Sequence, residues 1–420
     1  MRSLKLLRCW LLLVTLLASI WQVGVFAQSK PVAGTRAITT AEAQSTGVYW
    51  TSERMAAAVP REMLRQGGAA SGVRSAPTTV EPVVSSPGAP PKIDAAAAAL
   101  AAVGEEDYWT EERMKGAIPR EMGRVEPGQE AAAAPAPSPE ASVEPMGYAY
   151  PYPFTRYNVF RAFYYQTTPG YPPMSIFPFK TVGKLFFTLG ATDYVCSASV
   201  IRPHLLLTAR HCVFDYDSGL WATNTVFYPA YVPYVWPVPP YPCNKGNYLL
   251  GCAWNARLLA TWVSGSPGYQ YDIGFIQLYD HSGTPGSCNA YPSIDDYTGY
   301  LGWSYGGGYS SIHWDEFGYP QASPFTGNYM VESESSTGAL DVFGELNTVE
   351  VGNDMTGGSS GGPWIKNLSA GSTSSFNNYA NGLNSYRWIV PDHSLAMNGP
   401  QFLQNNFGSL YNFVMSIPCP

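Results

Sequence analysis

Short runs of apolar and β-branched residues, separated by turn-forming residues, recur through the middle of the chain. From Lys184 onward the runs are too short for helices and end at Gly, Pro, Asn or Asp, which is the pattern of β-strands. We expect six strands, at residues 185–189, 194–201, 205–208, 225–228, 258–263 and 273–278. Six strands suit one closed barrel.

A second set of short apolar runs extends from about Gly299 to Trp388, and it predicts a second group of strands. A closing helix is expected over about residues 401–415, because four apolar residues there recur at helical spacing. These residues are Phe402, Phe407, Leu410 and Val414.

Residues 1–27 have the pattern of a secretory signal peptide, with a basic start, an apolar centre and Val25-Phe26-Ala27 before the expected cleavage. The alternative is a membrane anchor, but Gln22 and Gly24 end the apolar run before it could comfortably span a bilayer. We therefore expect a secreted, extracellular protein. No later segment is apolar enough to cross a membrane, so no membrane association is expected after signal cleavage.

Residues 28–146 are rich in Ala, Pro, Gly, Ser and Glu, and we expect a largely disordered propeptide or spacer. They contain one internal repeat. The segments 49–55 (Tyr-Trp-Thr-Ser-Glu-Arg-Met) and 59–63 (Val-Pro-Arg-Glu-Met) recur with small changes at 108–114 and 118–122. Each copy could dock on the remaining chain as an inhibitor, a folding aid or an address. The alternative is a tandem duplication with no current role.

The amino-acid composition limits the classes of function that are possible. Only 13% of the 420 residues are charged, whereas Gly (41), Pro (36) and Tyr (29) are plentiful, which favours turns and β structure. A net charge of −7 argues against a nucleic-acid partner. The chain has no His-Glu-x-x-His zinc motif and no phosphate-binding glycine loop, so we expect no metal and no cofactor.

The chain has seven cysteines, of which Cys9 lies in the signal peptide. The remaining six are an even number, which suits disulfide formation in an oxidising compartment. They are Cys196, Cys212, Cys243, Cys252, Cys288 and Cys419.

The segment 358–363, Gly-Ser-Ser-Gly-Gly-Pro, has the residue types that a nucleophilic serine requires. Small neighbours allow a substrate carbonyl to approach the hydroxyl, and unobstructed backbone N–H groups can hold a developing oxyanion. Taken alone, the segment could equally be an ordinary Gly/Ser-rich turn.

Two further motifs precede this serine. His211 lies in Leu-Thr-Ala-Arg-His-Cys, and Asp272 lies in Tyr-Asp-Ile-Gly-Phe-Ile. The order His, Asp, Ser resembles the chymotrypsin/trypsin superfamily of serine endopeptidases, in particular the secreted bacterial-type branch related to glutamyl endopeptidases. The resemblance covers about residues 178–415.

The resemblance implies an all-β fold of two six-stranded antiparallel β-barrels with a C-terminal helix, formed by residues 147–420, with the site between the barrels. His211 would be the general base, Asp272 would orient it, and Ser360 would be the nucleophile. The oxyanion hole would be the backbone N–H groups of Gly358 and Ser360.

The resemblance also pairs Cys196 with Cys212. For the other four cysteines we expect Cys243–Cys252 and Cys288–Cys419, although spacing alone allows fifteen connectivities for six cysteines. Trypsin carries an aspartate at the place of Ser359, where it captures a new N-terminal amine. Serine cannot form that charge pair, so we expect a zymogen whose propeptide covers or chaperones the site instead.

Asp354 lies six residues before Ser360, where trypsin has the aspartate that binds Arg or Lys, and Asn384 and Ser385 are expected beside it in the substrate pocket. A carboxylate there would select a cation, although relatives of glutamyl endopeptidases can carry Asp at this place without basic specificity. The predicted function is a monomeric secreted serine endopeptidase that acts on polypeptides, with a possible preference for Arg or Lys. The alternative is a catalytically silent binding protein on the same fold.

Overall fold

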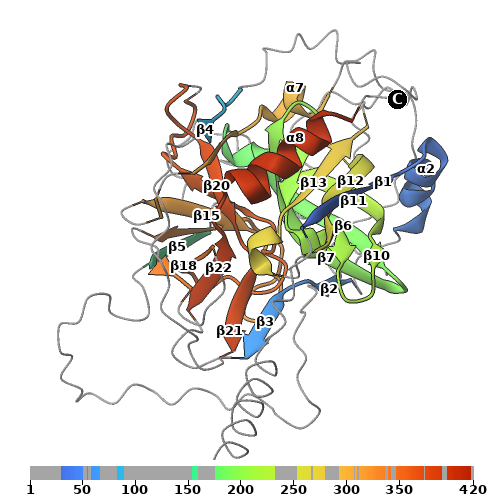
Figure 1. Cartoon of the computed structure of the whole chain (residues 1–420), viewed down its shortest axis with the longest axis horizontal. Helices are drawn as coiled ribbons and strands as arrows, with labels where there is room; N and C mark the ends of the chain where they lie inside the picture. Colours follow the sequence, from blue (N-terminus) through green and yellow to red (C-terminus); the bar gives the residue numbers. More distant parts are fainter. Residues whose placement is uncertain are drawn as a thin grey trace, which may run out of the picture.

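The computed structural model describes the greater part of residues 176–417 and selected segments before them (Figure 1). The described residues are 30–50, 54, 58–66, 83–88, 154–158, 176–231, 253–265, 268–279, 293–306, 308–309, 312–335, 339–341, 347–372, 374–389 and 395–417. The predicted signal peptide, the second repeat copy and four of the cysteines (Cys243, Cys252, Cys288 and Cys419) lie outside these ranges. None of the helices within them is long and apolar enough to cross a membrane.

The first half of the domain is a closed six-stranded antiparallel barrel. Its strands follow one another in the order β12-β11-β6-β7-β8-β13, and pairing between β12 and β13 closes the ring. The strands are β6 (Val182–Leu189), β7 (Thr192–Arg202), β8 (Leu205–Thr208), β11 (Thr223–Pro229), β12 (Trp254–Ser264) and β13 (Gly274–Leu278). All six predicted strands are therefore confirmed. A short hairpin, β9 (Phe214–Asp215) with β10 (Leu220–Trp221), lies outside the barrel sheet.

The second half differs in detail from the single closed antiparallel barrel that we expected. Within the described ranges its strands form two sheets, in the orders β4-β14-β20-β19-β15-β16-β5 and β17-β18-β22-β21-β3, and β14 pairs with β20 in parallel. Three of these strands come from earlier in the chain: β3 (Met63–Gln66), β4 (Val83–Val84) and β5 (Phe154–Asn158). The strands of this half are β14 (Gly302–Tyr305), β15 (Trp314–Gly318), β16 (Val331–Ser335), β17 (Ala339–Leu340), β18 (Thr348–Gly352), β19 (Pro363–Lys366), β20 (Tyr379–Leu383), β21 (Tyr386–Ile389) and β22 (Ala396–Pro400). The parallel pair joins β14 and β20, two strands that are far apart in the sequence.

The C-terminal helix is confirmed, with a wider first turn than expected. A π-helical turn, η6 (Gln404–Gly408), leads into α8 (Ser409–Met415). Phe407 is fully buried and stacks on Phe402 with 4.4 Å between ring centroids, and it contacts Phe275 of the barrel at 5.5 Å. These aromatic contacts attach the helix to the first barrel. The remaining helical segments are α7 (Ile294–Thr298) and the 3-10 turns η2 (Phe179–Thr181), η3 (Arg210–Cys212) and η4 (Tyr269–Tyr271).

Parts of the region that we expected to be largely disordered are instead packed on the domain. The described elements before the barrel are β1 (Val32–Ala37), α2 (Thr40–Tyr49), β2 (Val59–Pro60), β3 (Met63–Gln66), β4 (Val83–Val84) and β5 (Phe154–Asn158). β1 pairs antiparallel with residues 258–264 of β12, whereas β11 pairs with β12 only at Trp254 and Asn255. β1 thus covers a strand edge that would otherwise have no partner on that side.

The first repeat copy is anchored by Trp50, whose side chain is fully buried. Its indole N–H donates to the carbonyl oxygen of Asn224 at 2.6 Å, and its ring packs on Phe186 of the barrel. The neighbouring Tyr49 hydroxyl donates to Asp193 at 2.8 Å. Burial of an aromatic ring with its polar atom satisfied stabilises this attachment.

Candidate active site

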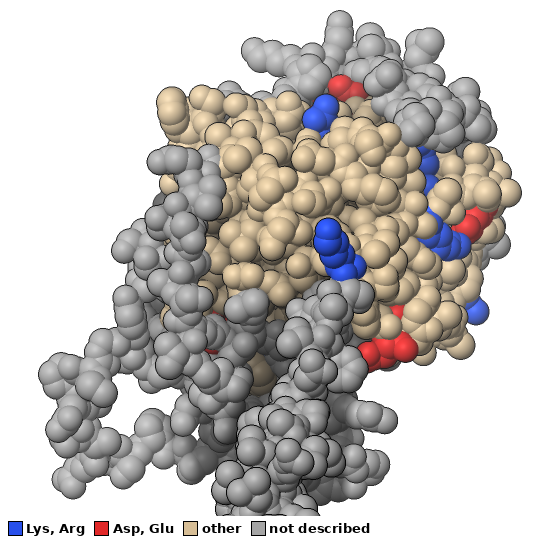
Figure 2. Space-filling model, viewed as in Figure 1, with Lys and Arg blue, Asp and Glu red and all other residues tan. Residues whose placement is uncertain are grey.

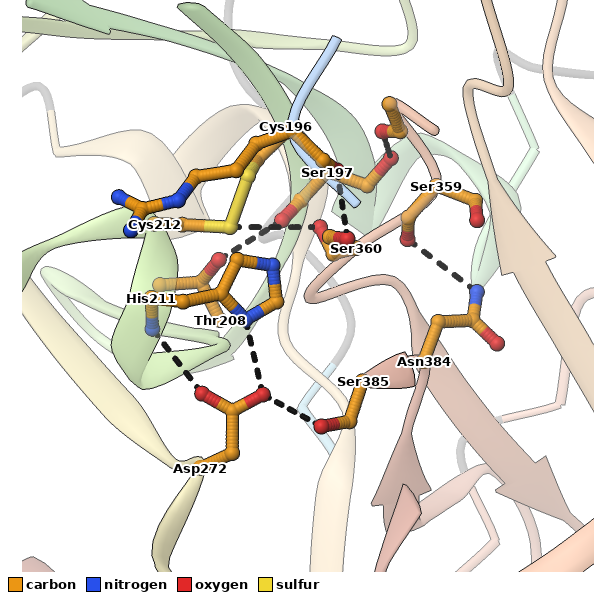
Figure 3. The surroundings of a disulfide bond; sticks show 12 residues. Cys196, Ser197, Thr208, His211, Cys212, Asp272, Ser359, Ser360, Asn384 and Ser385 are labelled. Carbon is orange, nitrogen blue, oxygen red and sulfur yellow. Dashed lines mark hydrogen bonds and ion pairs between the residues drawn. A yellow bond between two sulfur atoms is a disulfide. The ribbon is translucent and has the colours of Figure 1, made fainter. Parts of the chain in front are cut away.

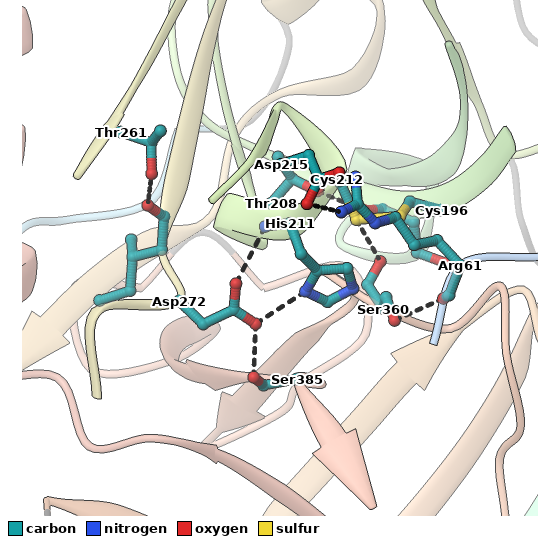
Figure 4. Close-up of polar contacts among 12 residues, drawn as sticks. Arg61, Cys196, Thr208, His211, Cys212, Asp215, Thr261, Asp272, Ser360 and Ser385 are labelled. Atoms are coloured by element: carbon teal, nitrogen blue, oxygen red, sulfur yellow. Dashed lines mark hydrogen bonds and ion pairs between the residues drawn. A yellow bond between two sulfur atoms is a disulfide. The ribbon is translucent and has the colours of Figure 1, made fainter. Parts of the chain in front are cut away.

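His211 and Asp272 are brought together by two neighbouring barrel strands. β8 and β13 pair antiparallel with Thr208 opposite Gly274, so the loop after β8 meets the loop before β13. Asp272 Oδ2 accepts a hydrogen bond from His211 Nδ1 at 2.8 Å, and Asp272 Oδ1 accepts one from the His211 backbone N–H at 3.0 Å. Both side chains are almost completely buried, and Figure 4 shows the imidazole between Asp272 and Ser360.

The Asp272 carboxyl is strongly acidic in this setting. Burial by itself would raise its pKa, but the neighbouring His211, Arg210 and the Ser385 hydroxyl lower the pKa to about 2. Ser385 donates to Asp272 Oδ2 at 2.5 Å. Asp272 is therefore ionised at neutral pH, as a group must be to fix the tautomer of the histidine and stabilise its protonated form.

Ser360 lies in a tight loop of the second half whose shape depends on glycine (Figure 3). Gly358 and Gly361 both have left-handed backbone conformations, with φ of 97° and 82°. A Cβ atom on Gly361 would lie 2.2 Å from Thr208 Oγ1 and 2.5 Å from the carbonyl oxygen of Ser197. These glycines let the loop turn sharply against the first barrel, which places Ser360 beside His211.

Ser197 of β7 holds the two halves together at this point, a role that we did not predict from the sequence. Its backbone N–H donates to the carbonyl oxygen of Ser360 at 2.8 Å, and its hydroxyl donates to the carbonyl oxygen of Gly358 at 2.9 Å. The same hydroxyl accepts from the Tyr319 N–H at 2.9 Å. The sequence feature that could have identified Ser197 is its position next to Cys196, because a disulfide at the site holds the neighbouring residue in a fixed place.

The Ser360 hydroxyl donates to the carbonyl oxygen of Arg61 at 2.7 Å (Figure 4). The same oxygen accepts from the Gly358 N–H at 3.2 Å. Gly358 is one of the two predicted oxyanion donors, so a peptide carbonyl group already lies between this N–H and the serine. The arrangement can hold the oxygen of an acyl group next to a nucleophile.

The disulfide between Cys196 and Cys212 is present, as expected, with 6.3 Å between the Cα atoms. It ties β7 to the turn that carries His211. The guanidinium of the neighbouring Arg210 lies over the Tyr216 ring at 5.0 Å. The other two predicted disulfides involve cysteines outside the described ranges and stay predictions.

The predicted pocket residue Asp354 is paired with a cation of the protein itself. Arg156 of β5 donates to Asp354 Oδ2 at 2.5 Å. Burial raises the pKa of Asp354, and the charges of Arg156 and Arg387 only partly oppose this. Asp354 Oδ1 is buried without a hydrogen-bond donor among the described residues, so the carboxylate keeps one acceptor for a further donor.

The other two predicted pocket residues use their side chains within the protein. Asn384 is fully buried, donates to the carbonyl oxygens of Phe317 and Ser359, and accepts from the Trp364 indole at 2.8 Å. The Ser385 hydroxyl donates to Asp272. Asn384 thus braces the loop of residues 357–362 (the nucleophile loop), and Ser385 orients Asp272. Both side chains are engaged inside the protein, which does not support the predicted substrate contacts.

Two groups of residues in the described ranges have the donor atoms of a metal site, and the first, Cys196, His211 and Cys212, contains the disulfide. In the second, His313, Asp315 and Glu334 have potential ligand atoms within 4.8 Å of one another. They lie at β15 and β16, and His313 is more than half exposed. Asp315 is buried and Glu334 is partly buried, and no further observation among the described residues points to a bound ion, so we assign no site to these three residues.

Comparison with known proteins gives structural neighbours but no sequence family. No protein-family model matches the chain, and no curated protein matches it significantly. The protease Anisep from Arthrobacter nicotinovorans is 30% identical, with 57% of this chain and 96% of that chain covered and a TM-score of 0.44. The thermostable serine protease AL20 from an extremophilic microorganism is 26% identical, with 57% and 99% covered and a TM-score of 0.44.

A Glu endopeptidase is 17% identical, with 60% of this chain and 96% of that chain covered and a TM-score of 0.42. All three TM-scores are below 0.5, so the fold is established by the strand order and closure described above. With one closed six-stranded antiparallel barrel, a second β half and a C-terminal helix, the chain has a trypsin-like fold and is similar to bacterial chymotrypsin-like serine proteases.

Proposed function

We propose that the chain is a secreted serine endopeptidase that hydrolyses peptide bonds through an acyl-enzyme intermediate. The supporting observation is the arrangement around one carbonyl oxygen: Ser360 Oγ lies 2.7 Å from the Arg61 oxygen, and the Gly358 N–H lies 3.2 Å from it. His211, held by Asp272, stands on the other side of the serine (Figure 4). A nucleophile, a base with its orienting carboxylate and an oxyanion donor thus surround one point.

In this mechanism His211 takes the proton of the Ser360 hydroxyl as the oxygen attacks the substrate carbonyl carbon. The carbonyl oxygen becomes negative and is held by the Gly358 and Ser360 N–H groups. His211 then donates the proton to the leaving amine, and the acyl group remains on Ser360 until water, activated by the same histidine, releases it. Asp272 stays ionised and fixes the imidazole throughout.

A fluorophosphonate probe tests the function directly, because it reacts only with an activated serine. The chain freed of the expected propeptide, residues 28–146 (the leader), should be labelled at Ser360, and the Ser360→Ala variant should not. Turnover of a peptide substrate should fall about a millionfold in that variant if the three residues act as a unit. Absence of labelling in the folded, leader-free protein would support the silent binding protein instead.

Preference for Arg or Lys is the finer part of the prediction and depends on Asp354. The open acceptor on Asp354 Oδ1 supports it. The ion pair with Arg156 opposes it, because a substrate cation would enter a pocket that already contains one. The preference therefore stays a prediction, and Arg156 is the residue that decides how strongly a substrate cation is attracted.

A further inference from the structure

One extended segment of the leader, residues 58–66, crosses the cleft at Ser360. Its first part, β2, pairs in parallel with Tyr194 and Val195 of the barrel. Its last part, β3, pairs in parallel with β21 of the second half. Figure 1 shows β2 next to β7 and β3 next to β21. Between β2 and β3, Arg61 and Glu62 contact the nucleophile loop. The leader therefore bridges both halves across the proposed active site.

Arg61 is the residue of this segment that reaches the nucleophile. Its carbonyl oxygen takes the hydrogen bonds of the Ser360 hydroxyl and the Gly358 N–H. Its side chain is fully buried and lies 3.7 Å from Asp215 of β9 and over the Tyr194 ring of β7. A substrate carbonyl oxygen cannot occupy the same position, so this contact and substrate binding exclude each other.

Glu62 provides the second contact, in which its carboxylate accepts two hydrogen bonds. Glu62 Oε1 accepts from Arg387 Nε of β21, and Oε2 accepts from the Gly357 N–H at 3.0 Å. Glu62 is only 2% exposed. A carboxylate with a charged donor on one oxygen and a backbone donor on the other is a strong anchor in a site from which water is excluded.

The charge around the pocket favours an acidic occupant. Asp354 carries one negative charge and has two arginines close by, Arg156 at 2.5 Å and Arg387 near enough to lower the pKa of its carboxyl. These three groups sum to one positive charge, and Glu62 brings the sum to zero. Glu62 is the buried charge of this group, and an unpaired buried carboxylate is costly, so its pairing with Arg387 is favoured.

We propose that Arg387 and the Gly357 N–H form a binding site for an acidic side chain, and that Glu62 occupies it so that the leader acts as a tethered competitive inhibitor. The inference rests on the proposed function. Attachment through β1 and Trp50 keeps the segment at high effective concentration beside the cleft, so a modest intrinsic affinity is enough to hold it there. The uncut chain thereby covers its own nucleophile, and removal of the leader opens the cleft.

The second repeat copy supplies a matched control. Glu121 stands in Ile-Pro-Arg-Glu-Met, the counterpart of Glu62 in Val-Pro-Arg-Glu-Met. Glu62→Gln and Glu121→Gln therefore make the same chemical change in nearly the same local sequence. Only the first should release the cleft if Glu62 is the anchor.

Hydrogen exchange tests the docking independently of activity. The measurement uses the full chain in a Ser360→Ala background, where self-cleavage cannot occur. Glu62→Gln should accelerate exchange of the amides in residues 355–362 about tenfold or more, whereas Glu121→Gln should leave it unchanged. Arg387→Gln should match the effect of Glu62→Gln, and the double variant should add little to either. Equal exchange in the parent and Glu62→Gln overturns the proposal.

Labelling separates this inference from the proposed function. With Ser360 intact, the fluorophosphonate should label the Glu62→Gln chain about tenfold or more faster than the wild-type and Glu121→Gln chains. A capped peptide of residues 58–66 should slow labelling of the Glu62→Gln chain, and the same peptide with Gln at 62 should not. Equal, rapid labelling of all three chains overturns the proposal that the leader is an inhibitor. If the leader-free protein is labelled but none of these chains is, Glu62 is not the anchor. If the leader-free protein is not labelled either, the proposed function is overturned, while the exchange result still decides where the leader binds.

Discussion

The Ser360 hydroxyl donates its hydrogen bond to the carbonyl oxygen of Arg61, 299 residues earlier in the chain. The serine of the proposed active site is therefore in contact with the leader of its own chain. The contact joins the two parts of the sequence that carried the most distinctive motifs, the repeat and the Gly/Ser segment. It gives the first repeat copy a location, and it makes the state of the leader the first variable to control in any assay.

Replacement of Asp272 tests the orienting role that we propose for it. Asp272→Asn keeps the size of the side chain but removes the charge that faces His211 Nδ1 at 2.8 Å, so the imidazole can adopt the wrong tautomer. We expect kcat to fall about ten-thousandfold with little change in KM. Steady-state kinetics on a peptide substrate, with circular dichroism as a check of folding, measures this. A loss of less than about tenfold would contradict the role.

The cation preference is tested by the ion pair that Asp354 makes. Arg156→Ala leaves the Asp354 carboxylate with one cation fewer, so cleavage after Arg or Lys should rise relative to other residues. Asp354→Ser should reduce that preference, most clearly when combined with Arg156→Ala. Digestion of a peptide library by the four forms gives the comparison. If neither change alters the preference, the basic-pocket prediction is wrong.

The shape of the nucleophile loop is tested by two glycines that share a left-handed conformation. Gly361 and Gly371 have φ of 82° and 74°, but a Cβ on Gly361 meets Thr208 at 2.2 Å, whereas none of the described atoms lies within 4 Å of a Cβ on Gly371. Replacement by alanine strains the backbone at both positions. We expect Gly361→Ala to lower the free energy of unfolding by about 1–3 kcal/mol more than Gly371→Ala does. Urea denaturation of both variants measures this difference. Equal losses of unfolding free energy would mean that the loop accommodates the extra atom.

Glu332 should make the stability of the second half sensitive to pH. Burial, together with the charges of Asp315 and Glu334, raises the pKa of Glu332 from 4.5 to about 8. Between these values the folded protein keeps a proton that the unfolded chain has lost, so the stability that Glu332 contributes is present below pH 4.5 and is lost as pH rises through 8. Glu332→Gln should flatten this decline in a series of thermal melts. An unchanged slope would show that Glu332 is not its source.

Much of the first barrel could be predicted because its information is local. Each of the six strands is a short apolar run with turn residues at its ends, and the pattern of alternation is visible without knowing the partner strand. The same holds for the residues near His211, Asp272 and Ser360, since the chemistry requires particular neighbours at fixed places. The Cys196–Cys212 disulfide followed from the resemblance and is present.

The pocket could not be read in the same way, because its charges come from distant elements. Asp354 suggested a cation site by its position before Ser360. The sequence did not show that Arg156, on a strand 198 residues earlier, would take one of its oxygens. We predicted that Asn384 and Ser385 lie near the substrate. In the structure the Asn384 side chain is hydrogen-bonded to Trp364, and the Ser385 side chain is hydrogen-bonded to Asp272. Which hydrogen bond a polar side chain makes depends on what folding brings to it.

By itself the sequence determined the barrel strands and the C-terminal helix, because each depends on neighbours along the chain. The three residues proposed for catalysis also come from local motifs and stay a prediction. Only the tertiary structure decided that part of a low-complexity leader is ordered, with Trp50 buried and Arg61 at the nucleophile. The physical reason is that the leader has few large apolar residues with which to fold alone. Its order comes from main-chain hydrogen bonds and a few buried side chains on a surface that exists only once the domain has formed.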